Sequence, residues 1–213
     1  TYDKDLSGLT SLCDALPALK NLIELDLSNC GLSVNVVNSV AVAISASAVV
    51  ETVAIGGNPI GSAGGATLLE TIKTSKLKTI DIGKPLPLQE RYESDTLDLS
   101  NTQMDPGHVL LLSWWLGTEF SDAVARLILD ENPLTGGTSS TDFDKDITGV
   151  VNLCDTLKTS SVTELSLAKC RLGPGSLGKL AEYVREATAA LNSVTVDSTG
   201  SRKLSRSIMV SQE

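Results

Sequence analysis

The chain contains few aromatic residues and almost no histidine. Its 213 residues include two Trp, three Tyr, two Phe and one His, and its four cysteines, at 13, 30, 154 and 170, form no CxxC pair. A zinc site built from four neighbouring ligands is therefore not predicted. The lone His108 has no acid or nucleophile at catalytic spacing, and no glycine-rich phosphate-binding loop is present. We predict a protein that is not an enzyme and uses neither metal nor cofactor.

Positive charge and long apolar runs are also scarce. The 17 Lys and Arg residues against 26 Asp and Glu give a net charge of −9, which argues against a nucleic-acid-binding surface because phosphate binding needs clustered cations. A basic protein or peptide is the better expected partner. The most apolar stretch, residues 34–50, is interrupted by Asn and Ser, so we predict no membrane insertion.

The chain also lacks any N-x-S/T glycosylation site, and this absence, like that of CxxC pairs, favours an intracellular location. We expect a cytoplasmic protein. The sequence starts at Thr1 and ends abruptly, so we expect a fragment of a longer protein, whose targeting signal would then be missing from it.

What the chain does contain is a repeated leucine-rich pattern, LxxLxLxx(N/C)xL. Residues 22–32, which read LIELDLSNCGL, match it at every fixed position. Further copies begin at residues 50, 94, 124 and 162, and partial copies begin at 77 and 191. The central residues are Leu25, Val53, Ile80, Leu97, Leu127, Leu165 and Val194, with steps of 28, 27, 17, 30, 38 and 29 residues. Steps of this length predict a short strand followed by an amphipathic helix in each unit.

These motifs resemble the ribonuclease-inhibitor-like leucine-rich repeat (LRR) family, which includes the repeats of NOD-like receptors and of the GTPase activator of Ran. The resemblance implies one α/β solenoid domain over residues 1–213, of about six to seven units. Parallel strands are expected on the concave face of a horseshoe and helices on its convex face. Because one unit cannot bury its own apolar face, the units are expected to stack.

The function implied by the resemblance is a non-catalytic protein–protein interaction or scaffold module, since the family hosts inhibitors, sensors and scaffolds. One alternative is a GTPase-activating protein of the Ran-activator type, for which Arg171 is the candidate residue. Another is an extracellular recognition receptor, against which the missing glycosylation sites argue. The partner, the pathway and the oligomeric state are not encoded in any motif.

A longer repeat overlies the short one. Residues 2–16, YDKDLSGLTSLCDAL, return as residues 143–157, FDKDITGVVNLCDTL, and Cys30 returns as Cys170. The chain therefore holds about one and a half copies of a five-unit block. The Asp-Lys-Asp of this phrase does not fit an EF-hand, because Ile147 and Leu153 replace the required Gly and Glu. We interpret it as helix capping.

Two units are irregular. The segment 83–96 is too short for a helix and contains two prolines, which predict an extended or hairpin connection and a gap among the helices. Residues 135–146 are rich in Gly, Ser, Thr and Asp and predict an inserted surface loop. At the Asn/Cys position of the motif, Asn58, Asn132, Cys30 and Cys170 are expected to bond the loop backbone. Cys13 and Cys154 are expected to be buried free thiols.

The first candidate surface is the concave face. Because strand side chains alternate, its outward charged residues are Glu24, Asp26, Asp81, Asp98, Arg126, Asp130, Glu164 and Asp197. Asp81 and Asp98 are expected on neighbouring strands, where they would concentrate negative potential. Two interpretations stay open: a surface for a cationic partner, or a solvated face that keeps the protein soluble.

The second candidate surface is the apolar helix after Met104. Its buried stripe is predicted as Val109, Leu112, Ser113 and Leu116, which leaves Leu110, Leu111, Trp114 and Trp115 in lateral or outward positions. Those four side chains form either a convex docking patch or the filling of the gap left by the missing helix. The second interpretation is favoured because the gap adjoins this helix.

Overall fold

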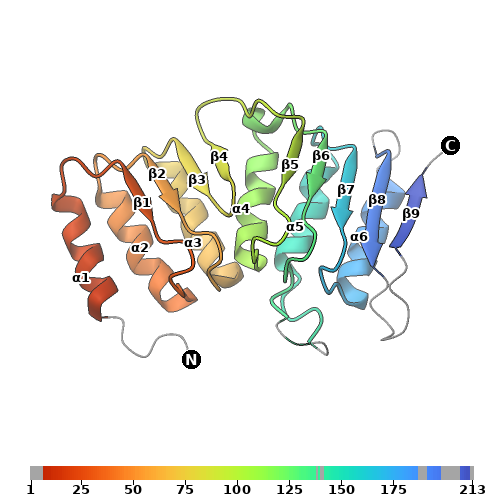
Figure 1. Cartoon of the computed structure of the whole chain (residues 1–213), viewed down its shortest axis with the longest axis horizontal. Helices are drawn as coiled ribbons and strands as arrows, with labels where there is room; N and C mark the ends of the chain where they lie inside the picture. The colour runs from red at the N-terminus through yellow and green to blue at the C-terminus, as the bar shows by residue number, and fades with distance from the viewer. Residues whose placement is uncertain (1–6, 138, 140–141, 187–190, 198–206, 212–213) are drawn as a thin grey trace.

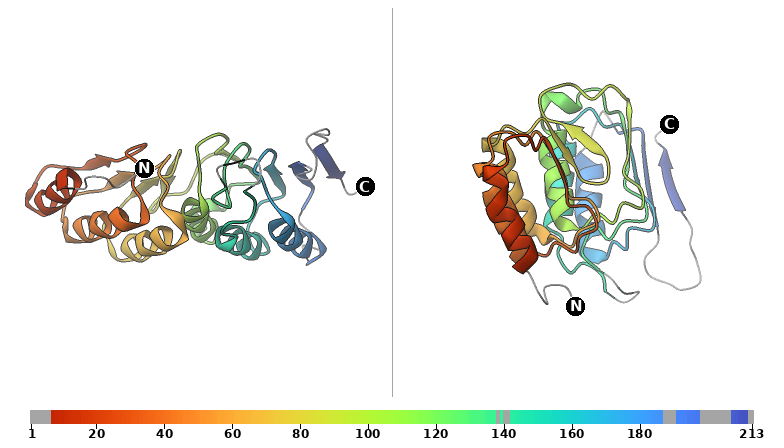
Figure 2. Two further views of the ribbon diagram at one scale, coloured as in Figure 1. Left: turned by 90° about the horizontal axis from the view of Figure 1, so that it is seen from below. Right: turned by 60° about the vertical axis from the view of Figure 1, so that its left-hand side comes forward.

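A computed structural model describes residues 7–137, 139, 142–186, 191–197 and 207–211, and helices alternate with strands along it (Figure 1). In chain order the elements are α1 (Ser7–Ala15), the 3-10 helix η1 (Leu16–Ala18), β1 (Glu24–Asp26), α2 (Val34–Ala46), β2 (Thr52–Ala54), α3 (Gly61–Thr74), β3 (Thr79–Asp81), β4 (Pro85–Pro87), β5 (Thr96–Asp98), α4 (Pro106–Leu116), the 3-10 helix η2 (Glu119–Ser121), β6 (Arg126–Ile128), α5 (Thr148–Leu157), β7 (Glu164–Leu167), α6 (Pro174–Glu186), β8 (Ser193–Asp197) and β9 (Ser207–Ser211). The strands form one layer and the helices cover one side of it (Figure 2).

The strand layer consists of two sheets. The first has the order β1-β2-β3-β4 and the second the order β5-β6-β7-β8-β9. Pairing is parallel from β1 to β3 and from β5 to β8, whereas β4 and β9 each pair antiparallel to the strand before them. The prediction of a mixed α/β fold with parallel strands is therefore confirmed.

The apolar pattern places the core. All seven predicted central residues lie in strands and none is more than 7% exposed, and they are Leu25, Val53, Ile80, Leu97, Leu127, Leu165 and Val194. Their strand neighbours point to the opposite face, as the alternation of a strand requires. The helices also contribute to the core, through stripes such as Val150, Leu153 and Leu157, each at most 3% exposed.

The loops that follow the strands repeat one backbone conformation. The residue before the Asn/Cys position has a positive φ in each near-complete repeat: 56° at Asn29, 71° at Gly57, 53° at Asn101, 61° at Glu131 and 57° at Lys169. This left-handed residue turns the chain from the strand toward the helix. Five sequence-distant loops therefore share a geometry that belongs to the repeat rather than to the individual residue.

Buried asparagines join consecutive units. The Asn132 amide donates to the carbonyls of Leu129 in its own unit and Leu99 in the preceding one, at 2.9 and 2.7 Å. Its Oδ1 accepts from the amides of Thr102 and Met104, each at 3.0 Å. Asn58 makes the equivalent bonds to its own unit and the one before it. These asparagines therefore bond the backbone of their own loop, as expected, and also connect that loop to the preceding unit.

The cysteines at the same motif position differ from each other. The Cys170 thiol is 1% exposed and donates to the carbonyl of Leu129 in the preceding unit, at 3.0 Å. Cys30 is exposed and approaches only the nearby Ser28 carbonyl, at 3.5 Å. The expected bond to the loop backbone is therefore present at both cysteines, but only Cys170 also reaches the preceding unit, because no described strand precedes β1. Cys13 and Cys154 are buried free thiols, which confirms the prediction for them.

The first sheet ends at β4, which forms an antiparallel hairpin with β3, as the prolines predicted. The amides of Ile82 and Leu88 bond within this hairpin, so the alternate residues Pro85 and Pro87 turn their nitrogens away from β3. Proline has no N–H to offer there, and a strand cannot add to an edge without donors. The short unit therefore closes one sheet before β5 begins the next.

The acidic residues of the repeated phrase cap helices, but not only the helix that follows them. Asp144 accepts from the amides of Gly173 and Gly175, at 3.0 and 2.6 Å, at the start of α6, one unit further along. Asp146 accepts from the amide of Thr148 at the start of α5, at 2.9 Å. The capping interpretation is therefore corrected for Asp144. The equivalent acids of the first copy, Asp3 and Asp5, lie outside the described residues.

The inserted segment at 135–146 is not wholly a surface loop. Thr135 and Gly137 are buried at its start, whereas Ser139, Phe143 and Lys145 are exposed further along. The Thr135 carbonyl accepts from the amide of Asp146 at 3.0 Å, which closes the segment on itself. The prediction therefore holds for the middle of the insertion and fails for its beginning.

Candidate interaction surfaces

The outward side of the strands, called the strand face below, carries the predicted acidic residues. Helices cover the opposite side of the strand layer (Figure 2). The structure leaves all eight predicted charged residues exposed or half-buried: Glu24, Asp26, Asp81, Asp98, Arg126, Asp130, Glu164 and Asp197. Between them lie small or medium side chains such as Ala54, Ile128 and Ser166, which share register rows with the acids.

Three of these acids also shape the loops that follow their strands. The carboxylates of Asp26, Asp81 and Asp98 accept from the backbone amide two residues on, at 2.8, 2.7 and 2.9 Å. The bond from the Ser28 amide lowers the pKa of Asp26, and the Ser100 hydroxyl and amide lower that of Asp98. Sequence reasoning missed this role, although Asp followed by Ser or Gly two residues later is an Asx-turn pattern.

Four of the other five charged residues of the strand face join neighbouring units. Arg126 forms an ion pair with Glu164 at 2.6 Å across β6 and β7, where the two residues are register partners. Asp130 accepts from the amide of Ala168 at 2.8 Å, and Asp197 accepts from that of Lys169 at 2.5 Å. The one basic residue predicted on this face is therefore neutralised within it, and the face keeps a net negative charge.

Asp81 and Asp98 do not lie on neighbouring strands, contrary to expectation. Asp81 is the register partner of Pro85, because β4 occupies the position beside β3. Asp98 lies at the start of the second sheet, and the nearby charge of Lys84 contributes to its lowered pKa after the Ser100 bonds. The strand β4 thus takes the position beside β3 where β5 was expected, and Lys84 lies near the Asp98 carboxylate.

The structure rejects half of the proposed convex patch. Leu111 and Trp115 are 1% and 0% exposed, so they do not belong to a docking patch and their burial agrees with the favoured gap-filling interpretation, whereas Leu110 and Trp114 are half-buried. The Trp115 indole packs edge-on against Tyr92, with ring centroids 5.7 Å apart. The predicted stripe of Val109, Leu112, Ser113 and Leu116 is buried, at 3% exposure or less. Because this helix is apolar on every side, the sequence could place the stripe that faces the core but could not tell which of the remaining apolar side chains are also buried.

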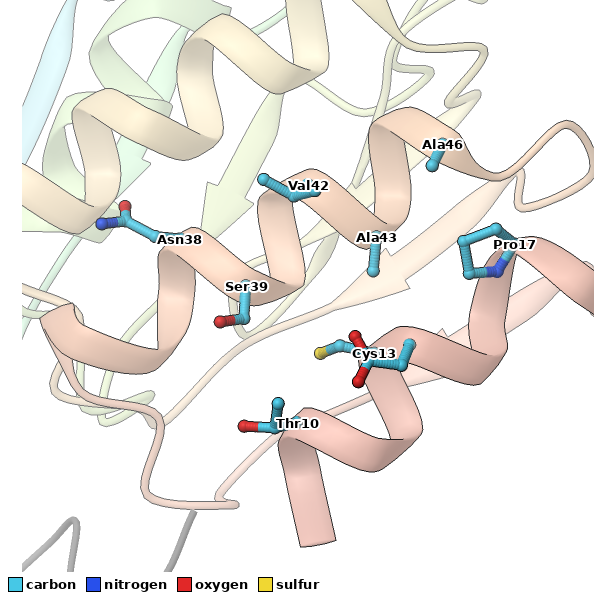
Figure 3. Close-up of a pocket in the computed structure, with 9 residues that line it drawn as sticks. Thr10, Cys13, Pro17, Asn38, Ser39, Val42, Ala43 and Ala46 are labelled. Atoms are coloured by element: carbon cyan, nitrogen blue, oxygen red, sulfur yellow. The ribbon is translucent and has the colours of Figure 1, made fainter. Parts of the chain in front are cut away.

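Shallow grooves run between the first helices, on the helix side of the strand layer. One of about 390 Å³ lies between α1 and α2, where Thr10 and Cys13 face Ser39 and Ala43 (Figure 3). A second of about 830 Å³ lies between α2 and α3, and Val42, which is 70% exposed, borders both. A third, of about 340 Å³, is polar and lies among the loops after β1, β2, β3 and β5.

His108 and Arg171 have structural explanations. His108 is fully buried, its Nδ1 lies 2.8 Å from the carboxylate of Asp105 at the start of α4, and its Nε2 donates to the Ile55 carbonyl at 3.2 Å. Arg171 is exposed with a φ of 55°, the conformation that Gly31 and Gln103 adopt at the same repeat position. Its exposure follows from the loop geometry and does not by itself indicate GTPase activation.

Neither a metal centre nor a membrane span is found in the part of the chain that the structure describes. There, no three His, Cys, Asp or Glu side chains gather as metal ligands would. Within the same residues, no helix has the length and apolarity needed to cross a bilayer.

Comparisons with known proteins identify one repeat directly. Residues 21–41, which include β1 and most of α2, match the family model described as Leucine Rich Repeat. No curated protein matches the chain in sequence. A solved structure from Caenorhabditis elegans, the tropomodulin C-terminal domain, aligns over 84% of this chain and 92% of its own, with 12% identity and a TM-score of 0.38. Likeness at that level says nothing about function. The chain therefore contains a leucine-rich repeat within a mixed α/β structure.

Proposed function

We propose that the protein is a non-catalytic protein-interaction module whose strand face binds a basic partner. One observation carries the proposal: the eight charged residues of that face are exposed or half-buried, and the helices pack on the other side of the sheets. Seven of the eight are acidic, and the single Arg126 is paired with Glu164. A surface of fixed negative charge attracts cationic partners and speeds their association.

The hydrogen bonds of Asp26, Asp81 and Asp98 make the face rigid. Each carboxylate is held by a backbone amide, so its charge sits at a fixed position before a partner arrives. Preorganised charge costs less conformational entropy on binding than charge on a mobile side chain. The small residues between the acids leave room for long Lys and Arg side chains to approach the sheets.

We propose that the units stack as a ribonuclease-inhibitor-like solenoid, supported by the shared loop geometry and by the asparagine bridges between consecutive units. The cytoplasmic location rests on the absence of glycosylation sites and CxxC pairs from the sequence.

A charge-matched comparison tests the binding surface. Asp26→Asn, Asp81→Asn and Asp98→Asn together remove three charges but keep an oxygen that accepts the loop amides. The control combines Asp14→Asn, Asp122→Asn and Asp155→Asn, which are exposed acids outside the strand face. Binding of a fluorescent decalysine peptide, measured by anisotropy at several salt concentrations, reports the affinity.

The strand-face variant is expected to bind the peptide several-fold more weakly than the control variant. Equal weakening of both would show that only net charge matters, and the proposed surface would then be abandoned. Circular dichroism of all three proteins verifies that the substitutions leave the fold intact.

A further inference from the structure

The duplicated phrase places the same helix in two different environments. In residues 143–157 this helix is α5, which packs between α4 and α6, and in residues 2–16 it is α1, the first element described (Figure 1). Sequence positions shared by the two copies therefore show what each environment provides. Differences in burial between matched residues identify a surface that is covered in one copy and open in the other.

The matched glycines show the clearest difference. A Cβ built on Gly149 of α5 would lie 2.7 Å from the Pro106 carbonyl oxygen and 2.9 Å from the Val109 Cβ, both on α4. A Cβ built on Gly8, the matching residue of α1, would meet nothing within 4 Å. Glycine at this position admits a neighbouring helix at close range. In α1, Gly8 would equally allow a neighbouring helix to pack closely, but no described residue lies at that position.

Apolar side chains agree with the glycines. Leu153 of α5 is 2% exposed, whereas its counterpart Leu12 is 40% exposed. Ile23, just before β1, is 58% exposed, while its counterpart Thr163 donates its amide to the Ala125 carbonyl beside β6. Leu19 is also exposed, at 42%. Three large apolar side chains of one unit are thus open to solvent, together with a strand, β1, that pairs on one side only.

The two cysteines at matching motif positions, Cys30 and Cys170, also differ in burial. Cys170 is buried and donates its S–H to Leu129 after the preceding strand, whereas Cys30 at the same motif position is exposed. In the second copy, the unit of α4 and β6 contacts the helix, the strand and the loop of the next unit. In the described chain, no such unit contacts α1, β1 or the loop that contains Cys30. The surface formed by Gly8, Leu12, Leu19, Ile23 and Cys30 is called the end surface below.

We propose that the end surface is a docking site for a further leucine-rich-repeat unit of the α4 type, joined ahead of α1 in the same polypeptide. Its helix would bring a Pro-Gly start and a β-branched residue against Gly8 and Leu12, as Pro106 and Val109 do against α5. Its strand would pair with β1 and cover Ile23. Its loop carbonyl would accept from the Cys30 thiol.

A second copy of this chain fits less well as the occupant. The α4 helix of a second copy already packs against its own α5. The last helix, α6, carries Lys179, Glu182, Arg185 and Glu186 on its more exposed positions, and charged side chains do not complement exposed leucines. The apolar end surface therefore matches an α4-like helix, which contains no Asp, Glu, Lys or Arg.

An extended chain tests the proposal. A copy of residues 77–142 is joined to Tyr2, so that it precedes the first phrase as the native segment precedes the second. This copy contains β3 to β6 and α4, and it keeps Pro87 and Tyr92 as partners for its own Trp115. Two readouts are followed in the extended and original chains: alkylation of Cys30 by N-ethylmaleimide, mapped by mass spectrometry, and amide hydrogen exchange across residues 7–16.

Docking is expected to slow both Cys30 alkylation and α1 exchange by at least about ten-fold, because both would then require local opening. Gly8→Leu should restore the fast rates in the extended chain, yet leave the alkylation rate of Cys30 in the original chain unchanged, since its α1 has free space at that position. Unchanged rates in the extended chain would overturn the proposal, whether the added unit is folded or not. Sedimentation of the original chain provides a further check: a dimer abolished by Leu12→Lys would assign the surface to a second copy instead.

Discussion

The indole Nε1 of Trp115 donates a hydrogen bond of 2.7 Å to the backbone carbonyl of Pro87. Trp115 lies on α4, and Pro87 lies on the last strand of the first sheet. The carbonyl faces away from β3, as the proline nitrogen does, so no strand satisfies it. The Trp115 side chain thus fills the space where the short unit lacks a helix. It also donates a hydrogen bond to β4, the edge strand of the first sheet.

Replacing Trp115 is expected to be among the most damaging single changes. Trp115→Ala should lower the free energy of unfolding by ~3–5 kcal/mol, since it empties a fully buried site. Trp115→Phe should cost less, because it keeps most apolar contacts and loses only the indole donor. Urea denaturation gives the values, with the half-buried Trp114→Ala as the matched control. Equal effects at the two tryptophans would refute this assignment.

Asn132 is predicted to be equally critical for a different reason. Asn132→Ala leaves buried carbonyls and amides of two units without partners, and each such group costs about 1–3 kcal/mol, so a total loss of at least about 3 kcal/mol is expected. Asn132→Cys should recover part of it, because Cys170 serves the same motif position with one donor. Asn152→Ala, at an exposed position, is the control, and the melting temperatures of the three variants are compared. An Asn132→Ala protein as stable as Asn152→Ala would contradict the bridging role.

The Asp144 cap should make stability depend on pH. Burial raises the pKa of Asp144, but hydrogen bonds from the Ser176 hydroxyl and from the amides of Gly173, Gly175 and Ser176 together lower it further, below the ordinary value. A carboxyl with a lowered folded pKa stabilises the fold above its unfolded pKa of about 4, and this contribution is lost as the pH falls through the folded value. Asp144→Asn should therefore reduce the melting temperature at pH 7.

The difference between the native protein and Asp144→Asn is expected to shrink progressively below about pH 4, where the native carboxylate becomes protonated. Melting curves from pH 2 to pH 7 follow it, with the exposed Asp155→Asn as a comparison. A difference that stays constant over this range would show that the Asp144 charge contributes nothing to the cap.

The two matched glycines should respond in opposite directions to the same substitution. Gly8→Ala is expected to stabilise the protein by up to ~0.5–1 kcal/mol, because alanine favours a helix and its methyl group meets no atom there. Gly149→Ala should destabilise it, because the methyl group would clash with Pro106 and Val109. Differential scanning calorimetry of both variants is the measurement. The same sign at both positions would show that α4 can shift away from α5 without cost.

The spacing of apolar residues in the sequence predicted the fold more completely than the interaction surfaces. The seven central strand residues and the buried stripe of α4 were placed correctly, because burying an apolar face requires a period of two in strands and 3.6 in helices. The interaction surfaces were predicted less completely. The outward acids of the strand face were found from alternation, but their hydrogen bonds and the placement of Asp81 and Asp98 in different sheets were not.

The reason lies in distance along the chain. Asp144 caps a helix that begins 30 residues later, and Trp115 bonds a carbonyl 28 residues before it. Neither partner is marked by a local pattern, since any nearby amide or carbonyl in the folded chain would serve. Cys30 and Cys170 occupy the same motif position, yet their burial differs because it depends on whether a unit lies ahead of them.

By itself, the sequence determined the repeat, the positions of the strands and the duplication that makes α1 and α5 comparable, because each follows from the periodic burial of apolar residues. Only the tertiary structure decided where the sheet breaks, which tryptophan is buried, which helix each acid caps and which copy of the duplicated phrase leaves its apolar face open. Those outcomes depend on what occupies the neighbouring space, and neighbouring space is filled by residues far away in the chain.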